Sequence, residues 1–205
     1  MPTLFLIRHG ENDALVRNIL PGRNPGIHLN GRGQEQAAEL ARTLGRLPIK
    51  AIYSSPLERA VETAEPLAQS LRLRIRLRQN LTDTDVGEWT GRSWKTLSRT
   101  KLWKVIRETP SQFQFPGGET FVQAQERVTH ALDAIVKAHG DELIAVVFHA
   151  DPIKLAIAHY LGMPLDNFQR LSAHTGSVTI LKMDGSGVKL LALNLIPPFS
   201  LPKRQ

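Results

Sequence analysis

The chain has 205 residues, of which 41% are hydrophobic and 22% charged, and its formal net charge at pH 7 is +7. These values are typical of one globular domain and exclude a disordered or fibrous protein. The lack of cysteine excludes disulfides and thiolate metal sites, and no apolar run approaches the roughly 20 residues of a membrane helix. We therefore expect a cytoplasmic protein that does not bind membranes. Its positive charge attracts anions, either phosphorylated metabolites or nucleic acid.

The first elements predict a strand followed by a helix. Residues 4–7 are apolar and indicate a buried strand that ends at residues 8–10, an Arg-His-Gly sequence. Asn30 is a typical N-cap, and the apolar residues behind it have helical spacing until Gly45.

A second strand and helix follow. Residues 51–53 predict the strand, after which we expect Ser55 to cap a helix and Pro56 to open it. Strand, helix, strand, helix indicates parallel strands with right-handed crossovers. Residues 72–78 alternate arginine with leucine or isoleucine, which predicts a half-buried strand with a solvated arginine face rather than a nucleic-acid stripe.

The C-terminal part contains the longest continuous apolar run, residues 143–148, which predicts a central strand ending at His149. A helix is expected over 151–161. Residues 177–193 then predict a closing hairpin that turns at 184–187, and residues 196–205 an irregular tail.

Three predicted strand ends thus present Arg8-His9, Arg59 and His149 at the edge of the sheet where open α/β folds bind ligands. Guanidinium groups are suited to a phosphoryl group in transfer, whose negative charge is spread over three oxygens. Without cysteine, a histidine among arginines is a good candidate nucleophile, because nearby cations lower its pKa and keep the imidazole neutral.

Further segments extend this pattern along the chain. In order, they are residues 6–11, 29–37, 54–64, 85–91, 115–120 and 147–151. Together they resemble the histidine phosphatase superfamily, which includes the cofactor-dependent phosphoglycerate mutases, and the resemblance covers nearly the whole chain. It implies one domain over residues 1–205 with an α/β/α sandwich of three layers, a mostly parallel sheet and a small cap over the site.

The resemblance also implies roles for single residues. Arg8 and Arg59 match the arginines that bind phosphate, His9 the nucleophile, and His149 the second histidine that binds phosphoryl oxygens. Ala150 stands where glycine is common, and its backbone N–H is expected to face the phosphate, provided that the backbone does not need a positive φ.

Asp83 occupies the position where the family usually has a glutamate that protonates the leaving oxygen. We therefore expect Asp83 to be the general acid, with Asp85 and Glu88 as the alternatives. Another departure is Leu15, which stands where many members have an asparagine that touches the phosphate.

Three polar residues near Leu15 are candidates to compensate for the missing asparagine: Asn12, Arg17 and Asn18. His149 and Asp151 lack a third ligand at a sensible spacing, so we expect neither a metal nor a cofactor. Trp89, Trp94 and Trp103 are expected to form the core of the cap rather than to touch substrate.

These assignments predict a phosphomonoester phosphatase with a phosphohistidine intermediate on His9 and a small-molecule substrate. One alternative is mutase-type phosphotransfer, although glycolytic mutases carry Arg-His-Tyr-Gly after the Trp-x-Gly motif and this chain has Arg92-Ser93-Trp94 there. The other is a non-catalytic phosphate or nucleic-acid binder, which His9 argues against. We expect no nucleic-acid partner, and monomer and homodimer both remain open.

Overall fold

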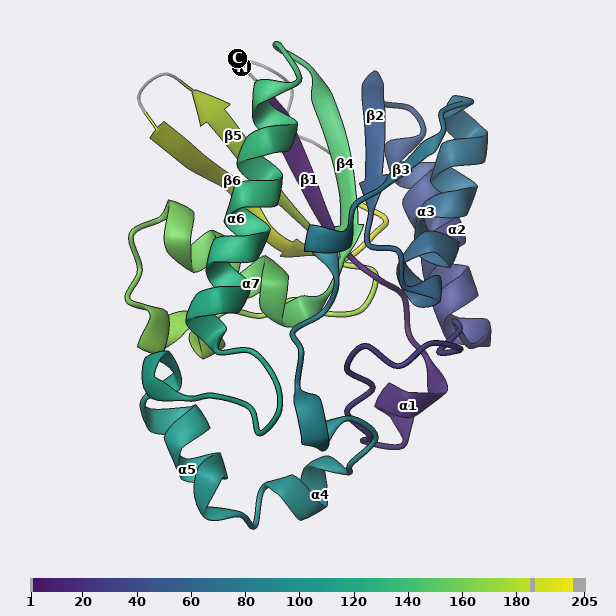
Figure 1. Cartoon of the computed structure of the whole chain (residues 1–205). Helices are drawn as coiled ribbons and strands as arrows, with labels where there is room; N and C mark the ends of the chain where they lie inside the picture. Colours follow the sequence, from purple (N-terminus) through teal and green to yellow (C-terminus); the bar gives the residue numbers. More distant parts are fainter. Residues whose placement is uncertain (1, 185–186, 201–205) are drawn as a thin grey trace.

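A mixed sheet of six strands forms the centre of the molecule, in the order β3-β2-β4-β1-β5-β6 (Figure 1). The computed structural model describes residues 2–184 and 187–200. Part of the predicted hairpin turn, residues 185 and 186, and part of the predicted tail, residues 201–205, lie outside this range. The strands are β1 Thr3–Arg8, β2 Ile49–Ser54, β3 Ile75–Leu77, β4 Leu143–Phe148, β5 Val178–Asp184 and β6 Gly187–Leu195.

The first four strands are parallel, and β5 and β6 add an antiparallel edge. β4 lies between β2 and β1, as its continuous apolar sequence predicts. Parallel strands end at one edge of the sheet, so the segments that follow β1, β2 and β4 lie close together.

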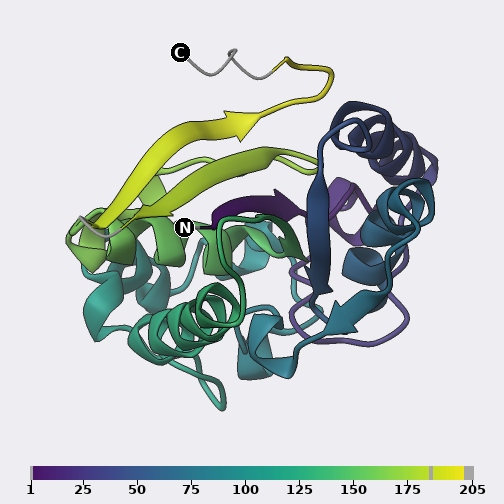
Figure 2. The ribbon, with the colours of Figure 1, turned by 90° about the horizontal axis from the view of Figure 1, so that it is seen from above.

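Helices cover both faces of the sheet, with α2 and α3 on one side and α6 and α7 on the other (Figures 1 and 2). Alternation along β1 explains the two cores, because Leu4 and Leu6 pack toward α6 and α7 while Phe5 and Ile7 pack toward α2 and α3. The predicted three-layer fold is confirmed. The α-helices are α1 Asp13–Val16, α2 Gly31–Leu44, α3 Glu58–Leu71, α4 Trp94–Leu97, α5 Lys101–Glu108, α6 Phe121–Lys137 and α7 Ala150–Tyr160.

Helix boundaries follow the sequence at α2 but differ at α3. Asn30 caps α2 by accepting a hydrogen bond from the Gly33 backbone N–H at 2.9 Å. The prediction that Ser55 caps α3 is wrong, since the N-cap is Leu57. The backbone N–H of Ser55 donates to Val147 of β4 at 2.9 Å, so Ser55 still continues the strand and the helix can only begin after it.

The strand predicted over residues 72–78 is much shorter in the structure. Helix α3 extends to Leu71 and ends at Arg72, which has a left-handed backbone with φ of 56°, and only Ile75–Leu77 form β3. Leu77 was expected on the buried face but is 50% exposed, because β3 is an edge strand. Arg76 lies over the ring of Tyr53 on β2, 5.5 Å from its centroid.

The cap lies beyond the carboxyl ends of the parallel strands and carries α4 and α5 (Figure 1). Trp89 is buried and stacks on Trp103 with ring centroids 6.3 Å apart, and Trp94 contacts Trp103 edge-on. Leu97 and Ile106 belong to the same apolar cluster as Trp89 and Trp103. Trp89 and Trp103 therefore lie in the core of the cap as predicted, whereas Trp94 is only partly buried and packs at its edge. Within the described ranges, no helix is both long and apolar enough to cross a membrane.

Candidate active site

Two histidines meet at the carboxyl edge of the parallel strands. His9 follows β1 and His149 follows β4, and their ring centroids are 5.2 Å apart. Arg59 reaches this point from the first turn of α3, after β2, and Arg8 is the last residue of β1. The convergence of these four residues at one edge was expected from the sequence, and the structure brings them together.

His9 is buried, with 2% of its surface exposed, and its Nδ1 lies 2.7 Å from the carbonyl oxygen of Gly10. A carbonyl only accepts, so Nδ1 carries the proton and Nε2 carries the lone pair. Burial lowers the pKa of His9 well below its ordinary value, and His149, Arg59 and Arg8 lower it further. The imidazole is therefore neutral at physiological pH, as a nucleophile requires.

Two glycines allow the loop after β1 to lie against the start of α2. A Cβ on Gly10 would come within 2.7 Å of the Gly33 carbonyl oxygen, and one on Gly33 within 2.1 Å of the Glu11 carbonyl oxygen. Side chains fix the same loop, since the N–H of Gly10 donates to the Thr63 hydroxyl and that of Glu11 donates to Gln36. Through these contacts, the family segments 6–11, 29–37 and 54–64 lie against one another in the folded protein.

Both arginines retain buried donors that no described residue pairs with. Arg59 is fully buried and uses Nη2 to donate to the Gly22 carbonyl at 2.8 Å, while Arg8 donates from Nη1 to the Ala173 carbonyl at 2.7 Å. Nε of Arg8, and Nε and Nη1 of Arg59, are buried and have no hydrogen-bond partner among the described residues. Buried unpaired donors are costly, and an anion with several oxygens matches them.

The His149 side chain is completely buried, and its Nε2 lies 2.8 Å from the Ser55 hydroxyl oxygen. Burial lowers the pKa of His149 well below its ordinary value, and Arg59 and Arg8 add to this effect. Ala150 opens α7 with a helical backbone, so alanine is accommodated there without strain. Its N–H belongs to the first turn, where backbone donors have no partner within the helix.

The carboxylate of Asp83 lies beside the other site residues. Its Oδ2 is 3.1 Å from Nη2 of Arg59 and 3.7 Å from Nδ1 of His149, and the side chain is 19% exposed. Asp85 instead pairs with Arg23 at 3.3 Å and accepts from the Gly87 N–H.

Glu88, the other alternative to Asp83, is exposed and precedes the buried Trp89 of the cap. Of the three carboxylates that the sequence offered, Asp83 is the one that contacts both Arg59 and His149. This geometry favours Asp83 as the proton donor.

Sequence reasoning missed a network that holds the backbone of Asp83. Arg23 donates from Nε to the Asp83 carbonyl at 2.7 Å, and Arg127 of α6 donates to the same carbonyl at 3.3 Å and to that of Thr82 at 3.0 Å. Glu119 joins the two arginines by accepting from both. Glu119 lies in a segment of the family pattern, but neither arginine stood out in the sequence.

The three polar candidates around Leu15 are placed differently. Asn12 is fully buried and caps α1 through Oδ1, which accepts from the Leu15 N–H at 3.0 Å. Its Nδ2 is buried and has no hydrogen-bond partner within the described part of the chain. Arg17 and Asn18 are exposed. Asn12 is therefore the candidate that retains a buried donor.

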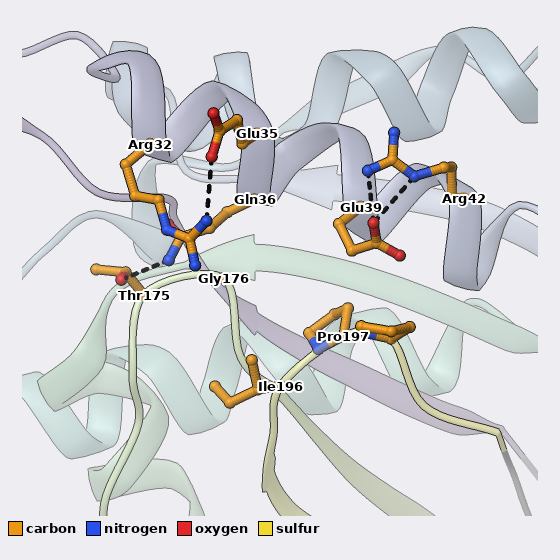
Figure 3. A pocket seen from close by; sticks show the side chains of 10 residues that line it. Arg32, Glu35, Gln36, Glu39, Arg42, Thr175, Gly176, Ile196 and Pro197 are labelled. Atoms are coloured by element: carbon orange, nitrogen blue, oxygen red, sulfur yellow. Dashed lines mark hydrogen bonds and ion pairs between the residues drawn. The ribbon is translucent and has the colours of Figure 1, made fainter.

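A hollow of about 350 Å³ lies away from this edge, between α2 and the segment after β6 (Figure 3). Ion pairs on α2 line it, such as Arg32 with Glu35 at 3.0 Å, and Gln36 donates across it to the Thr175 hydroxyl. It contains none of the histidines. The converging histidines and arginines lie instead at the strand ends, and no cluster of residues suited to a metal occurs anywhere in the described ranges.

Comparison with known proteins decides the family. The model of the histidine phosphatase superfamily (branch 1) matches residues 4–196. The chain belongs to this superfamily. This histidine phosphatase is 30% identical over 200 residues to phosphoserine phosphatase 1 of Hydrogenobacter thermophilus, covering 95% of this chain and 93% of the relative. The resemblance found in the sequence is thereby confirmed, and the chain is placed among enzymes.

Relatives of this histidine phosphatase carry more than one activity in their names. The 2,3-bisphosphoglycerate-dependent phosphoglycerate mutase of Thermoplasma acidophilum is 30% identical over 188 residues, which cover 90% of this chain and 88% of the mutase. Among solved structures, Bacillus stearothermophilus YhfR superimposes with a TM-score of 0.87 at 27% identity, covering 93% of this chain and 95% of that one.

Proposed function

We propose that this histidine phosphatase hydrolyses small phosphomonoesters in the cytoplasm through a phosphohistidine on His9. The observation that carries the proposal is the state of His9, a neutral imidazole with its lone pair on Nε2. Around it lie buried arginine donors that have no hydrogen-bond partner in the described part of the chain. A nucleophile and an oxyanion site thus occur together, and both are needed for phosphoryl transfer through a covalent intermediate.

In the first step, Nε2 of His9 attacks phosphorus, the ester P–O bond breaks, and the leaving oxygen takes a proton from the Asp83 carboxyl group. In the second step, water attacks the phosphohistidine, Asp83 accepts the water proton, and His9 and phosphate are released. Arg8, Arg59 and His149 bind the phosphoryl oxygens in both steps.

Two further donors fit the same anion, namely the backbone N–H of Ala150 and Nδ2 of Asn12. With this set of donors, the charge that develops on the phosphoryl oxygens is neutralised by guanidinium groups. A divalent metal is then not required.

The structural role of residues 92–94 in the cap favours hydrolysis over mutase chemistry. Ser93 is the N-cap of α4, and Trp94 packs against Trp103. The segment is therefore part of the cap core in this protein, whereas glycolytic mutases carry Arg-His-Tyr-Gly at this point.

The proposal is tested by assaying the purified protein, without added metal, on phosphoserine, sugar phosphates and nucleotides, and on 3-phosphoglycerate with the bisphosphate primer. Hydrolysis is expected to exceed isomerisation. Efficient isomerisation would instead support a mutase. Failure to turn over any ester, together with DNA binding that weakens steeply with salt, would support a non-catalytic binder.

A further inference from the structure

We propose that Ser55 sets the tautomer of His149 and thereby turns this histidine into a hydrogen-bond donor to the phosphoryl group. Ser55 is then a positioning residue, which acts through His149. The catalytic consequence rests on the proposed function, while the tautomer itself can be measured independently of any activity.

The first step is the charge state of His149. The side chain is fully buried, and burial and the neighbouring arginines lower its pKa. A neutral imidazole carries one N–H and one lone pair. Only one of its two nitrogens can therefore donate, and the choice of nitrogen decides whether the site gains a donor or a second acceptor.

The second step concerns the surroundings of the two nitrogens. Nε2 lies 2.8 Å from the Ser55 hydroxyl oxygen. Nδ1 is 3.7 Å from Oδ2 of Asp83 and has no hydrogen-bond partner among the described residues. Asp83 in turn contacts Arg59, so Nδ1 is the nitrogen on the side where the arginine donors gather.

The third step is the direction of the Ser55 hydrogen bond. Ser55 is held by its own N–H, which donates to Val147, and its hydroxyl oxygen already accepts from the N–H of Leu57 at 3.3 Å. If the hydroxyl donates to Nε2 of His149, both the hydroxyl and Nε2 are satisfied. Nδ1–H then faces Asp83 at 3.7 Å, beyond hydrogen-bond distance, and stays available to a phosphoryl oxygen. In the opposite tautomer the hydroxyl hydrogen has no other acceptor within the described residues. While Asp83 is ionised, that tautomer also places a lone pair of Nδ1 opposite a carboxylate.

The two histidines thus present opposite groups. His9 donates from Nδ1 to the Gly10 carbonyl and leaves a lone pair for attack on phosphorus. His149 accepts at Nε2 from Ser55 and leaves an N–H for the oxygens around that phosphorus. The Ser55 hydroxyl determines which ring nitrogen of His149 accepts a hydrogen bond and which one carries the N–H.

The test uses protein labelled with ¹⁵N in histidine and long-range ¹H–¹⁵N correlation spectra, in which protonated and unprotonated ring nitrogens resonate in separate ranges. His149 is assigned by its loss in His149→Gln. The wild type should show Nδ1–H and an unprotonated Nε2. In Ser55→Ala, Nε2–H should become populated, and kcat/KM should fall on the order of tenfold, as expected for one lost hydrogen bond.

Two variants serve as comparisons. Ser54→Ala removes a neighbouring hydroxyl that donates to the Ser55 carbonyl and should preserve both the His149 tautomer and kcat/KM. Ser55→Thr retains a hydroxyl and should restore Nδ1–H, with folding of each variant checked by thermal unfolding.

An Nε2–H tautomer in the wild type, or a Ser55→Ala variant with unchanged tautomer and rate, would overturn the inference. The expected tautomer in a protein that hydrolyses no phosphomonoester would leave the assignment to Ser55 intact and refute the proposed function instead.

Discussion

Acidification should destabilise this protein through its two buried histidines. Their pKa values in the folded protein lie well below the ordinary value, whereas in the unfolded chain they are about 6.5. As the pH falls below that value, His9 and His149 bind protons only in the unfolded chain, so their contribution to stability is lost. The loss continues until the pH reaches the folded pKa values.

The magnitude follows from linkage. Each buried histidine contributes a slope of up to about 1.4 kcal/mol per pH unit on the acid side of pH 6.5. Integrated from about pH 7.5 to about pH 5.5, this amounts to at most roughly 1.4 kcal/mol for each histidine and at most roughly 3 kcal/mol for both. A loss of this size is a large fraction of the stability of an ordinary domain.

The assay is urea unfolding, followed by tryptophan fluorescence at several pH values in buffers free of phosphate, because an anion bound to the folded site would add stability of its own. His149→Gln should remove about half of the predicted acid-side loss. His130→Gln, which replaces an exposed histidine on α6, should retain the wild-type slope. Equal slopes for the wild type and His149→Gln would refute the reasoning.

Three further predictions concern activity. Asp83→Asn should slow the hydrolysis of alkyl phosphates about a hundred-fold or more while sparing the first step with p-nitrophenyl phosphate, whose leaving group needs no proton. If Asp85→Asn or Glu88→Gln shows this dependence on the leaving group and Asp83→Asn does not, that other residue is the general acid. EDTA should leave turnover unchanged, and loss restored by a divalent ion would contradict this. Raising salt from about 0.02 to about 0.3 M should lower kcat/KM severalfold, because the cap exposes six cations between residues 92 and 108 and one acidic residue, Glu108, which pairs with Lys104. A salt-independent kcat/KM would count against such steering. These cations are Arg92, Lys95, Arg99, Lys101, Lys104 and Arg107.

The sequence was most informative where the signal is local. The apolar run of β4 and the Asn30 cap of α2 depend on neighbouring residues, and both were predicted correctly. The start of α3 was placed too early because Ser55 and Pro56 fit a helix N-terminus by type, whereas the backbone of Ser55 pairs with β4. A sequence does not show which of two backbone partners a residue will take.

Contacts between distant segments explain the residues that were missed. Arg127 meets the Asp83 carbonyl across 44 positions of sequence and Arg23 across 60, and nothing in their own neighbourhoods marks them. The role inferred for Ser55 has the same origin, since His149 is 94 positions away. In a chain with many arginines, the few that hold the site cannot be recognised from the sequence, because most of the others are solvated on the surface.

The central claim is that phosphorus becomes bonded to His9 during turnover. The direct measurement is to mix the protein with a ³²P-labelled phosphomonoester, quench within milliseconds without acid, and locate the label by mass spectrometry of peptides. A phosphoryl adduct that is stable to alkali, labile to acid and located on His9 is predicted, and it should be absent from His9→Ala, which should still bind vanadate through Arg8 and Arg59. Turnover that persists in His9→Ala, or label on another residue, would contradict the account.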